Sequence, residues 1–309
     1  MGEGQNSMRV AIKPIRSLPD FKRVEDIQRT IWGFRDTAII PYTQMITVQH
    51  NGGTLLGAYV DSELVGFVYG YLGMSGGTLY LFSMRAGVLP AYQSMGLGAK
   101  LKLAQREQML RSGIDLIVWT YDPLLGPNAM LNLEKLGGIA RAYVRDIYGS
   151  VSDNPFQAGL SLDRFLLEWH LLSDRVRGRI AGNYQPPTAE EWVNEKRYRL
   201  VNDVNWRGDL PYPTGTDLAL DDPAILVQVP SNINDLKRCD LAVAREWRNV
   251  TRSIFETYFR RGYVVTGFAR DKKRDALNIY NLEKTSFPSP IDYFSWAKGI
   301  EDGDIKDEA

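Results

Sequence analysis

Two glycines one residue apart, Gly96 and Gly98, mark the segment of this sequence that is best suited to chemistry. They lie where an apolar run that ends at Val88 passes into a run with helical periodicity that begins at Leu97. Glycine lets the backbone approach a ligand without an intervening Cβ atom, and the first turn of a helix carries unpaired N–H groups and the positive end of its dipole. The segment therefore predicts an anion site, in outline a phosphate site.

Two widespread phosphate motifs do not fit this segment. A Walker loop needs Gly-Lys followed by Ser or Thr, but Ala99, Lys100 and Leu101 stand in those places. A dinucleotide fingerprint needs a third glycine three residues after Gly98, where the sequence has Leu101. Neither a P-loop nucleotide nor a dinucleotide is the expected ligand.

The segment instead resembles the acyl-coenzyme A loop of the GNAT N-acyltransferase superfamily. That pattern reads Val, any, Pro, any, aromatic, Gln or Arg, two of any, Gly, apolar, and Gly or Ala. The matching positions here are Val88, Pro90, Tyr92, Gln93, Gly96, Leu97 and Gly98. The alternative is that the two glycines only shape a turn between strand and helix. The number of matched positions favours a site for the coenzyme A pyrophosphate.

The resemblance implies transfer of an acyl group from acetyl-coenzyme A, or from another short acyl-coenzyme A such as succinyl-coenzyme A, to a primary amine. It also implies that two central parallel strands separate and admit the pantetheine arm between them. Backbone N–H groups of Ala86 and Val88 would face the pantetheine and the thioester, and the Ala86 N–H would polarise the carbonyl. The other coenzyme contacts that the resemblance implies are Gln93, Ser94, Met95, Gly96, Leu97, Gly98, Ala99, Lys100 and Asn128.

The sequence departs from the family pattern at the catalytic positions. Many relatives carry a carboxylate base on the strand before the loop, but residues 79–88 contain neither Asp nor Glu. Leu133 stands where relatives often carry the tyrosine that protonates the thiolate. The remaining candidates for a general base are Asp122, Glu168 and His170, or a chain of water molecules. Each of the three also has a structural reading, as a helix cap, a surface charge and an interior imidazole.

Arg85 is the only charged residue on the strand that precedes the loop. A guanidinium there could bind a carboxylate through two hydrogen bonds, which would favour an amino-acid acceptor or a dicarboxylic acyl group such as succinyl. The alternative is a surface arginine paired within the protein. Trp32, Trp119 and Tyr121 are further predicted substrate contacts. Trp32 belongs to an aromatic loop that could line an acceptor pocket or seal the core.

Residues 8–175 carry the elements that must position these groups. Their predicted order, β-α-α-β-β-β-α-β-α-β-β, is the order of the GNAT fold, a mixed α/β sheet with splayed central parallel strands and flanking helices. The expected strands are 8–15, 54–60, 64–72, 78–88, 114–120, 139–148 and 165–172, and the expected helices begin at Ser17, cover 41–49, begin at Leu97 and cover 128–136.

The rest of the chain divides by composition. Residues 1–7 and 286–309 are expected to be loose ends, and 176–222, rich in Pro, Gly and charge, predicts a linker or lid. Residues 223–285 predict a smaller α/β unit, with a strand at 224–229, one helix over 235–261 that contains a buried Cys239 near its start, and a hairpin of 263–270 with 277–282. This unit is a possible half-repeat of the first, and a possible homo-oligomer contact.

Composition limits the classes of partner. Lys plus Arg and Asp plus Glu both number 37 among 309 residues, so the zero net charge disfavours nucleic acid and anionic membranes. No apolar run reaches the roughly 18 residues of a membrane span, and the start lacks the features of a secretory signal. One cysteine and two histidines predict a cytoplasmic protein without a metal site. We expect a small-molecule amine as the acceptor.

Two functions remain open from the sequence alone. The first is an N-acyltransferase that works by direct attack of the amine on the thioester. The second is a catalytically silent module that binds acyl-coenzyme A as a sensor or scaffold, which the missing carboxylate and tyrosine favour. Direct transfer within a ternary complex needs only proximity, a deprotonated amine and a donor for the leaving thiolate. The enzyme is therefore the expected function.

Overall fold

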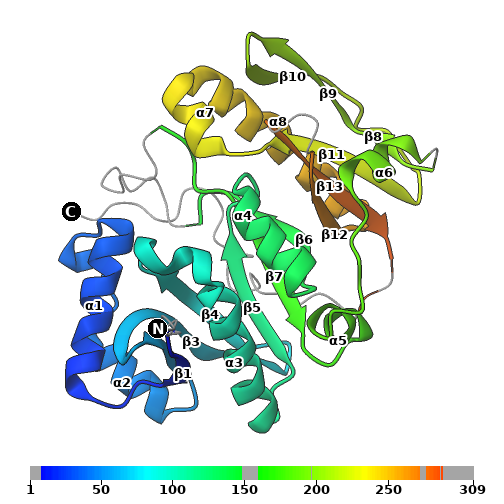
Figure 1. Ribbon diagram of the computed structural model, residues 1–309. Helices are drawn as coiled ribbons and strands as arrows, with labels where there is room; N and C mark the ends of the chain where they lie inside the picture. The colour runs from blue at the N-terminus through cyan, green and yellow to red at the C-terminus, as the bar shows by residue number, and fades with distance from the viewer. Residues whose placement is uncertain (1–7, 148–158, 196, 272–275, 286, 288–309) are drawn as a thin grey trace, which may run out of the picture.

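A computed structural model describes residues 8–147, 159–195, 197–271, 276–285 and 287 of the protein (Figure 1). Its central feature is an eleven-stranded sheet. The strands are β1 (Val10–Pro14), β2 (Thr54–Val60), β3 (Glu63–Ser75), β4 (Thr78–Val88), β5 (Leu116–Tyr121), β6 (Ile139–Val144), β7 (Arg164–His170), β8 (Arg199–Leu200), β11 (Ala224–Pro230), β12 (Tyr263–Arg270) and β13 (Leu277–Lys284). They lie in the order β1-β2-β3-β4-β5-β7-β6-β12-β13-β11-β8, and β9 (Asn202–Arg207) with β10 (Leu210–Thr216) forms a separate hairpin.

Helices cover both faces of this sheet. They are α1 (Leu18–Trp32), α2 (Tyr42–His50), α3 (Leu97–Arg111), α4 (Gly126–Ala129), α5 (Asp174–Ile180), α6 (Ala189–Asn194), α7 (Ile233–Cys239) and α8 (Leu241–Arg260), with short turns η1 (Asp36–Ala38), η2 (Pro90–Met95) and η3 (Met130–Lys135). Leu55 packs with Val24 of α1, whereas the next strand residue, Leu56, packs with Leu97 of α3. Because successive strand residues point to opposite faces, α1 and α3 cover opposite sides of the sheet.

The first part of the chain confirms the predicted α/β architecture. Ser17 caps α1 as its sequence context indicated, since the Asp20 N–H donates to the Ser17 Oγ atom at 3.2 Å. The helix ends at Gly33, which has a positive φ of 62° that glycine adopts without strain. β6 and β7 pair as the expected antiparallel hairpin next to β5. The central sheet is therefore mixed, with β4 and β5 parallel at its middle.

The C-terminal part differs from expectation in two places. The single helix predicted over 235–261 is two helices, α7 and α8, separated by Asp240. The backbone of Asp240 is extended, and its side chain accepts hydrogen bonds from the N–H groups of Ala242 and Val243, so it ends one helix and caps the next. Cys239, predicted to be buried, is exposed at the end of α7. The range 176–222, predicted as a linker or lid, contains most of α5, all of α6 and the strands β8 to β10.

The last third of the chain extends the same sheet rather than standing apart from it. β12 pairs antiparallel with β6 through Val265 and Ala140, and α8 packs over this junction. Figure 1 shows the early elements, blue to green, in the lower part of the view and the later ones, yellow to red, in the upper part. Among the described helices, none is both long and apolar enough to cross a membrane.

A buried ion pair between Asp122 and Arg248 crosses this junction. The Arg248 Nη1 and Nη2 atoms lie 2.9 and 2.5 Å from the two carboxylate oxygens of Asp122. Tyr280 donates a hydrogen bond of 2.6 Å to the carbonyl of Pro123, the next residue after Asp122. These contacts join the end of β5 to α8 and β13, more than 120 residues later in the chain.

We expect Arg248→Met to lower the free energy of unfolding by about 3–5 kcal/mol, because it leaves the Asp122 carboxylate buried without its cation. Urea unfolding followed by circular dichroism measures this difference. Arg111→Met is the matched control, since Arg111 is exposed and its contact with Glu107 lies on the surface, so its loss should cost less than about 1 kcal/mol. Equal losses in the two variants would contradict a structural role for the buried pair.

Candidate functional site

The parallel strands β4 and β5 separate toward their carboxyl ends. They pair only at Leu81 with Ile117 and at Phe82 with Val118. Beyond these pairs β4 continues along β3 up to Val88, and β5 continues along β7. Ala86, in the middle of the separated part of β4, is exposed. We call the space between residues 83–88 of β4 and 119–121 of β5 the strand opening.

A β-bulge lies where the strand opening begins. Tyr69 pairs with Arg85 and Tyr71 with Phe82, so two residues of β4, Ser83 and Met84, face the single residue Gly70 of β3. A Cβ atom on Gly70 would lie 2.8 Å from the carbonyl oxygen of Phe82, so the close approach requires glycine. The bulge increases the local bend of β4 and so helps to direct it away from β5.

The strand opening exposes backbone groups of β4. The Leu89 N–H donates to the Val65 carbonyl of β3 at 2.8 Å. Since N–H groups alternate in direction along a strand, those of Gly87 and Leu89 point to β3, and those of Ala86 and Val88 point to the strand opening. The Val88 carbonyl faces the same way, because it accepts a 3.1 Å hydrogen bond from the Gln93 side chain. Both N–H groups therefore lie on the side of β4 where the sequence analysis expects the pantetheine.

The segment from Leu89 to Gly98, which we call the glycine loop, connects the end of β4 to α3. This helix has no side-chain cap at its N-terminus. Gly96 has a φ of +68° and turns the chain from η2 into α3. Neither a side-chain cap nor an acidic residue stands at the first turn of α3, and a Cβ atom on Gly96 or Gly98 would meet no described atom within 4 Å. The N–H groups of residues 97–99 therefore face open space beside the strand opening. This arrangement suits an anion.

The other predicted loop residues differ in their surroundings. The side-chain amide of Gln93 donates a hydrogen bond to the Val88 carbonyl and so holds the loop against the end of β4. Ser94 and Lys100 are exposed, and Met95 packs against the apolar cluster under the loop. Asn128 is exposed in α4, which follows β5.

Asp122 follows β5 at the edge of the strand opening, but it is committed to Arg248. The Leu124 N–H donates to its Oδ1 atom at 2.8 Å in addition to the ion pair. Burial raises the pKa of Asp122, but the charge and hydrogen bonds of Arg248 outweigh burial and leave the pKa below its ordinary value. A carboxylate held in this way is a weak base, which argues against the predicted role of Asp122 in deprotonation.

Glu168 and His170 lie together on β7. Glu168 is buried, accepts two hydrogen bonds from Arg141 at 2.9 and 2.6 Å, and lies 2.9 Å from the His170 Nε2 atom. Burial raises the pKa of Glu168, but hydrogen bonds from His170 and Arg141 outweigh it and the pKa is lowered. His170 pairs with Leu116 at the start of β5, the end away from the strand opening. The structure therefore does not bring the three predicted bases together.

Arg85 and Trp32 do come together, on the sheet face that α1 covers. The Arg85 Nη1 atom donates to the Gln28 Oε1 atom at 2.6 Å and to the Ala38 carbonyl at 3.1 Å. Its guanidinium lies 5.6 Å from the ring centre of Trp32 and 4.8 Å from that of Phe34. These contacts hold one face of the guanidinium against aromatic rings beside the bulge.

Trp119 and Tyr121 lie on the opposite face of the sheet, in the core. The Trp119 ring packs edge-to-face with Trp169, and the Tyr121 ring with Phe165. Burial raises the pKa of Tyr121, so its hydroxyl stays protonated at physiological pH. Their burial argues against the predicted contact of either ring with an acceptor.

Lys102 was missed by the sequence analysis. It is 5% exposed, and its Nζ atom donates to the Ser83 Oγ atom at 2.7 Å and lies 3.7 Å from the centre of the Trp119 ring. Ser83 in turn donates to Gln105, which donates to Thr54. Burial lowers the pKa of Lys102 to about 7. The sequence signal for the burial of Lys102 is its place in the helix, next to the inward-facing Leu101.

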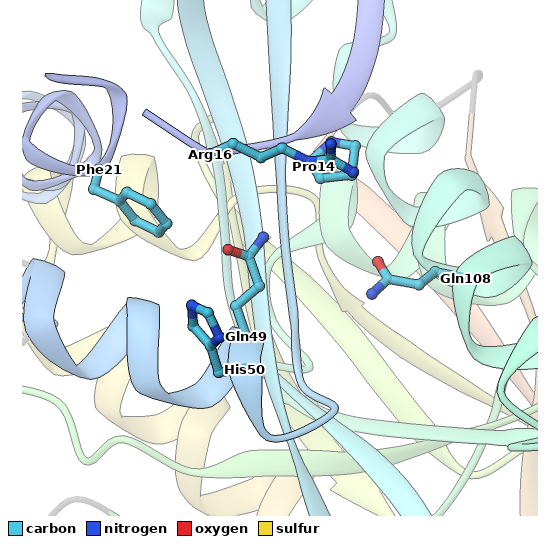
Figure 2. A pocket seen from close by; sticks show the side chains of 6 residues that line it. All are labelled: Pro14, Arg16, Phe21, Gln49, His50 and Gln108. Atoms are coloured by element: carbon cyan, nitrogen blue, oxygen red, sulfur yellow. The ribbon is translucent and has the colours of Figure 1, made fainter. Parts of the chain in front are cut away.

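A surface pocket of about 420 Å³ lies elsewhere, at the opposite end of α3 from the glycine loop. Its lining residues are Pro14, Arg16, Phe21, Gln49, His50 and Gln108 (Figure 2). It contains none of the predicted site residues. Within the described ranges, no group of three or more His, Cys, Asp or Glu side chains is arranged to hold a metal ion.

Comparison with known proteins finds a family whose sequence model matches the segment that contains the strand opening. Residues 21–137 match the sequence model of the acetyltransferase (GNAT) family. No curated protein sequence matches the chain. Many solved structures are similar to the chain, and the three described next each cover little more than half of it.

Naa50 of Arabidopsis thaliana, solved with a bisubstrate analogue, is 15% identical, with 52% of this chain and 97% of that chain covered and a TM-score of 0.40. The ribosomal-protein-S18-alanine N-acetyltransferase of Escherichia coli is 13% identical, with 53% and 94% covered and a TM-score of 0.42. The yncA protein of Salmonella typhimurium, solved with its cofactor acetyl-CoA, is 18% identical, with 52% and 94% covered and a TM-score of 0.42.

The lowered pKa of Lys102 predicts a pH dependence of stability. Between pH 7 and 10.5 the unfolded chain binds a proton at this amine that the folded protein does not bind, so the unfolding free energy should rise with pH over that interval. The expected rise is on the order of a few kcal/mol. Lys102→Met should remove this contribution and should be more stable than the wild type at pH 7. Urea unfolding between pH 7 and 9 measures both effects, and parallel pH profiles in the two proteins would rule the shift out.

Proposed function

We propose, on the premise that residues 21–137 form an acetyltransferase (GNAT) family domain, that this protein is an N-acyltransferase. In this proposal it moves an acetyl or another short acyl group, such as succinyl, from acyl-coenzyme A to a primary amine of a small molecule. The zero net charge of the chain supports a small acceptor over a nucleic acid.

One observation carries the proposal, the alignment of the glycine loop with the strand opening. The free N–H groups of residues 97–99 would bind the coenzyme A pyrophosphate, and the helix dipole favours its charge. The pantetheine arm would then run along the exposed edge of β4, where the Val88 N–H faces it. The Ala86 N–H would donate to the thioester carbonyl and stabilise the negative charge that develops on its oxygen.

The residues around the strand opening support direct transfer. The amine nitrogen attacks the thioester carbon, the C–S bond breaks, and the coenzyme leaves as a thiolate that takes up a proton. Asp122 and Glu168 are both held as ion-paired carboxylates, so we propose that the amine reacts in its neutral form after losing its proton to water. Proximity and the Ala86 N–H then supply the rate enhancement.

Arg85 supports an acceptor that carries a carboxylate, in the simplest case an amino acid. Its guanidinium is fixed by Gln28 and by two aromatic rings on the α1 side of the strand opening. A guanidinium oriented in advance loses little conformational entropy when it binds a carboxylate. This face is the one from which an amine would reach the thioester without crossing α3.

A silent acyl-coenzyme A binding module is the second function to consider. Leu133, at the position of the frequent family tyrosine, is fully buried in the core and offers no proton to a thiolate. Asp122 and Glu168, the two carboxylates considered as the general base, are both ion-paired. These observations favour binding without turnover, so an assay must separate the two functions.

The coenzyme site is tested by Gly98→Asp, with Gly98→Ala as the matched control. A Cβ atom at this position meets no described atom, and an acidic residue in the first turn of a helix is favourable, so neither variant should lose stability. The aspartate places a negative charge where the pyrophosphate would bind, and we expect it to weaken coenzyme A binding at least about tenfold. Calorimetry measures the affinity. Unchanged affinity in Gly98→Asp would contradict the assignment.

Transfer is tested by thiol release from acetyl- and succinyl-coenzyme A in the presence of amino acids and the corresponding amines without a carboxylate. We expect release with at least one amino acid, and we expect Arg85→Gln to lower kcat/KM for that amino acid about 10- to 100-fold more than for its decarboxylated amine. Binding of coenzyme A without thiol release across the panel would favour the silent module. An equal effect of Arg85→Gln on both acceptors would exclude carboxylate recognition by Arg85.

A further inference from the structure

Lys102 is the exception among the fully buried cationic side chains of the described structure. The other two are Arg179, which lies 2.9 Å from a Glu134 oxygen, and Arg248, which forms the pair with Asp122. Lys102 has no carboxylate within ion-pair distance among the described residues. Burial without a counter-ion disfavours the charged form of a lysine, so the presence of an amine at this position calls for an explanation.

The surroundings of Lys102 orient its amine but place no negative charge beside it. The Ser83 hydroxyl accepts one of its hydrogen bonds and the face of the Trp119 ring attracts its charge. Gln105 fixes Ser83 in turn, through a hydrogen bond of 2.8 Å. All of these partners are uncharged. Leu101 and Met109 show that the surrounding helix surface is suited to apolar residues, so a cation is not needed for packing.

The ammonium lies at the narrow end of the strand opening. Ser83 and Trp119 are the residues that directly follow the last paired positions of β4 and β5. Ala86, whose N–H would bind the thioester carbonyl, lies three residues further along β4, which is at most about 10 Å in an extended chain. An acyl group that extends from the thioester toward the narrow end of the strand opening therefore approaches Lys102.

We propose that Lys102 binds the free carboxylate of a dicarboxylic acyl group, so that the acyl donor is a carboxyacyl-coenzyme A of the succinyl type. The inference rests on the proposed function and names the class of donor for the same site. The carboxylate of the acyl group would supply the negative charge that the protein does not place beside Lys102. Arg85 lies on the other face of β4, so acyl group and acceptor would each have a cation of their own.

This role has a consequence for protonation. The amine of Lys102 is partly neutral near pH 7 in the free protein, and a carboxylate beside it favours the charged form. Binding of a carboxyacyl donor should therefore take up a fraction of a proton from solution. An acyl group without a carboxylate should not cause this uptake.

The test uses two inert thioether analogues, S-(3-carboxypropyl)-coenzyme A and its carboxamide, which differ only in the terminal charge. We expect the carboxylate to bind the wild type at least about tenfold more tightly at pH 7.5, with proton uptake seen by calorimetry in buffers of different ionisation enthalpy. Lys102→Met should bind both analogues alike and without uptake. Lys135→Met, which removes an exposed lysine of η3, should keep the preference.

The outcomes separate this inference from the proposed function. Equal binding of the two analogues by the wild type overturns the role of Lys102 and leaves coenzyme A binding intact. A preference that survives in Lys102→Met also overturns it. So does a variant that weakens both analogues equally, because the lysine would then serve the coenzyme and not the acyl carboxylate. Failure of both analogues to bind the wild type overturns the proposed function itself. The wild-type comparison stands even where the variant is not obtained in folded form.

Discussion

The site depends on one break in hydrogen bonding, the loss of pairing between β4 and β5 after Phe82 and Val118. Backbone donors in a protein interior are normally paired, so a strand edge that is left open near the centre of a sheet must be compensated or must serve a ligand. Three neighbouring features shape the chain around this loss of pairing. The bulge opposite Gly70 bends β4, the hydrogen bond from Gln93 to Val88 fixes where the strand ends, and Gly96 directs α3 back along the strand opening.

The C-terminal region supports the strand opening from outside the matched family segment. The family match ends at residue 137, but Asp122, which ends β5, is held by Arg248 of α8. Glu134 accepts a hydrogen bond from the Phe268 N–H of β12 and so ties η3 to the same region. These contacts are buried and directional, so they help to fix the direction of β5. Residues 21–137 therefore contain the strand opening but only part of what holds it open.

Local signals predicted most of the fold and the glycine loop, whereas the partners of the charged residues could not be predicted. Ser17, Gly33 and the spacing from Val88 to Gly98 act within a few residues, and the sequence displays them directly. The roles of Asp122 and Glu168 depend on ion pairs with arginines of other elements. No local sequence pattern indicates which arginine pairs with which carboxylate. Lys102 looks like an ordinary surface lysine on an amphipathic helix. Only the position of β4 and β5 shows that it is buried.

The two edges of the sheet limit the addition of strands from other chains. One edge is β1, whose five residues include Lys13 and Pro14, and the other is β8, only two residues long and containing Arg199. Proline lacks a donor, charged side chains resist burial between strands, and a short strand offers little to pair with, so both edges discourage the growth of intermolecular β-structure. A sheet this wide would otherwise be prone to aggregation. The composition and length of its edge strands therefore protect this sheet from adding strands of other chains.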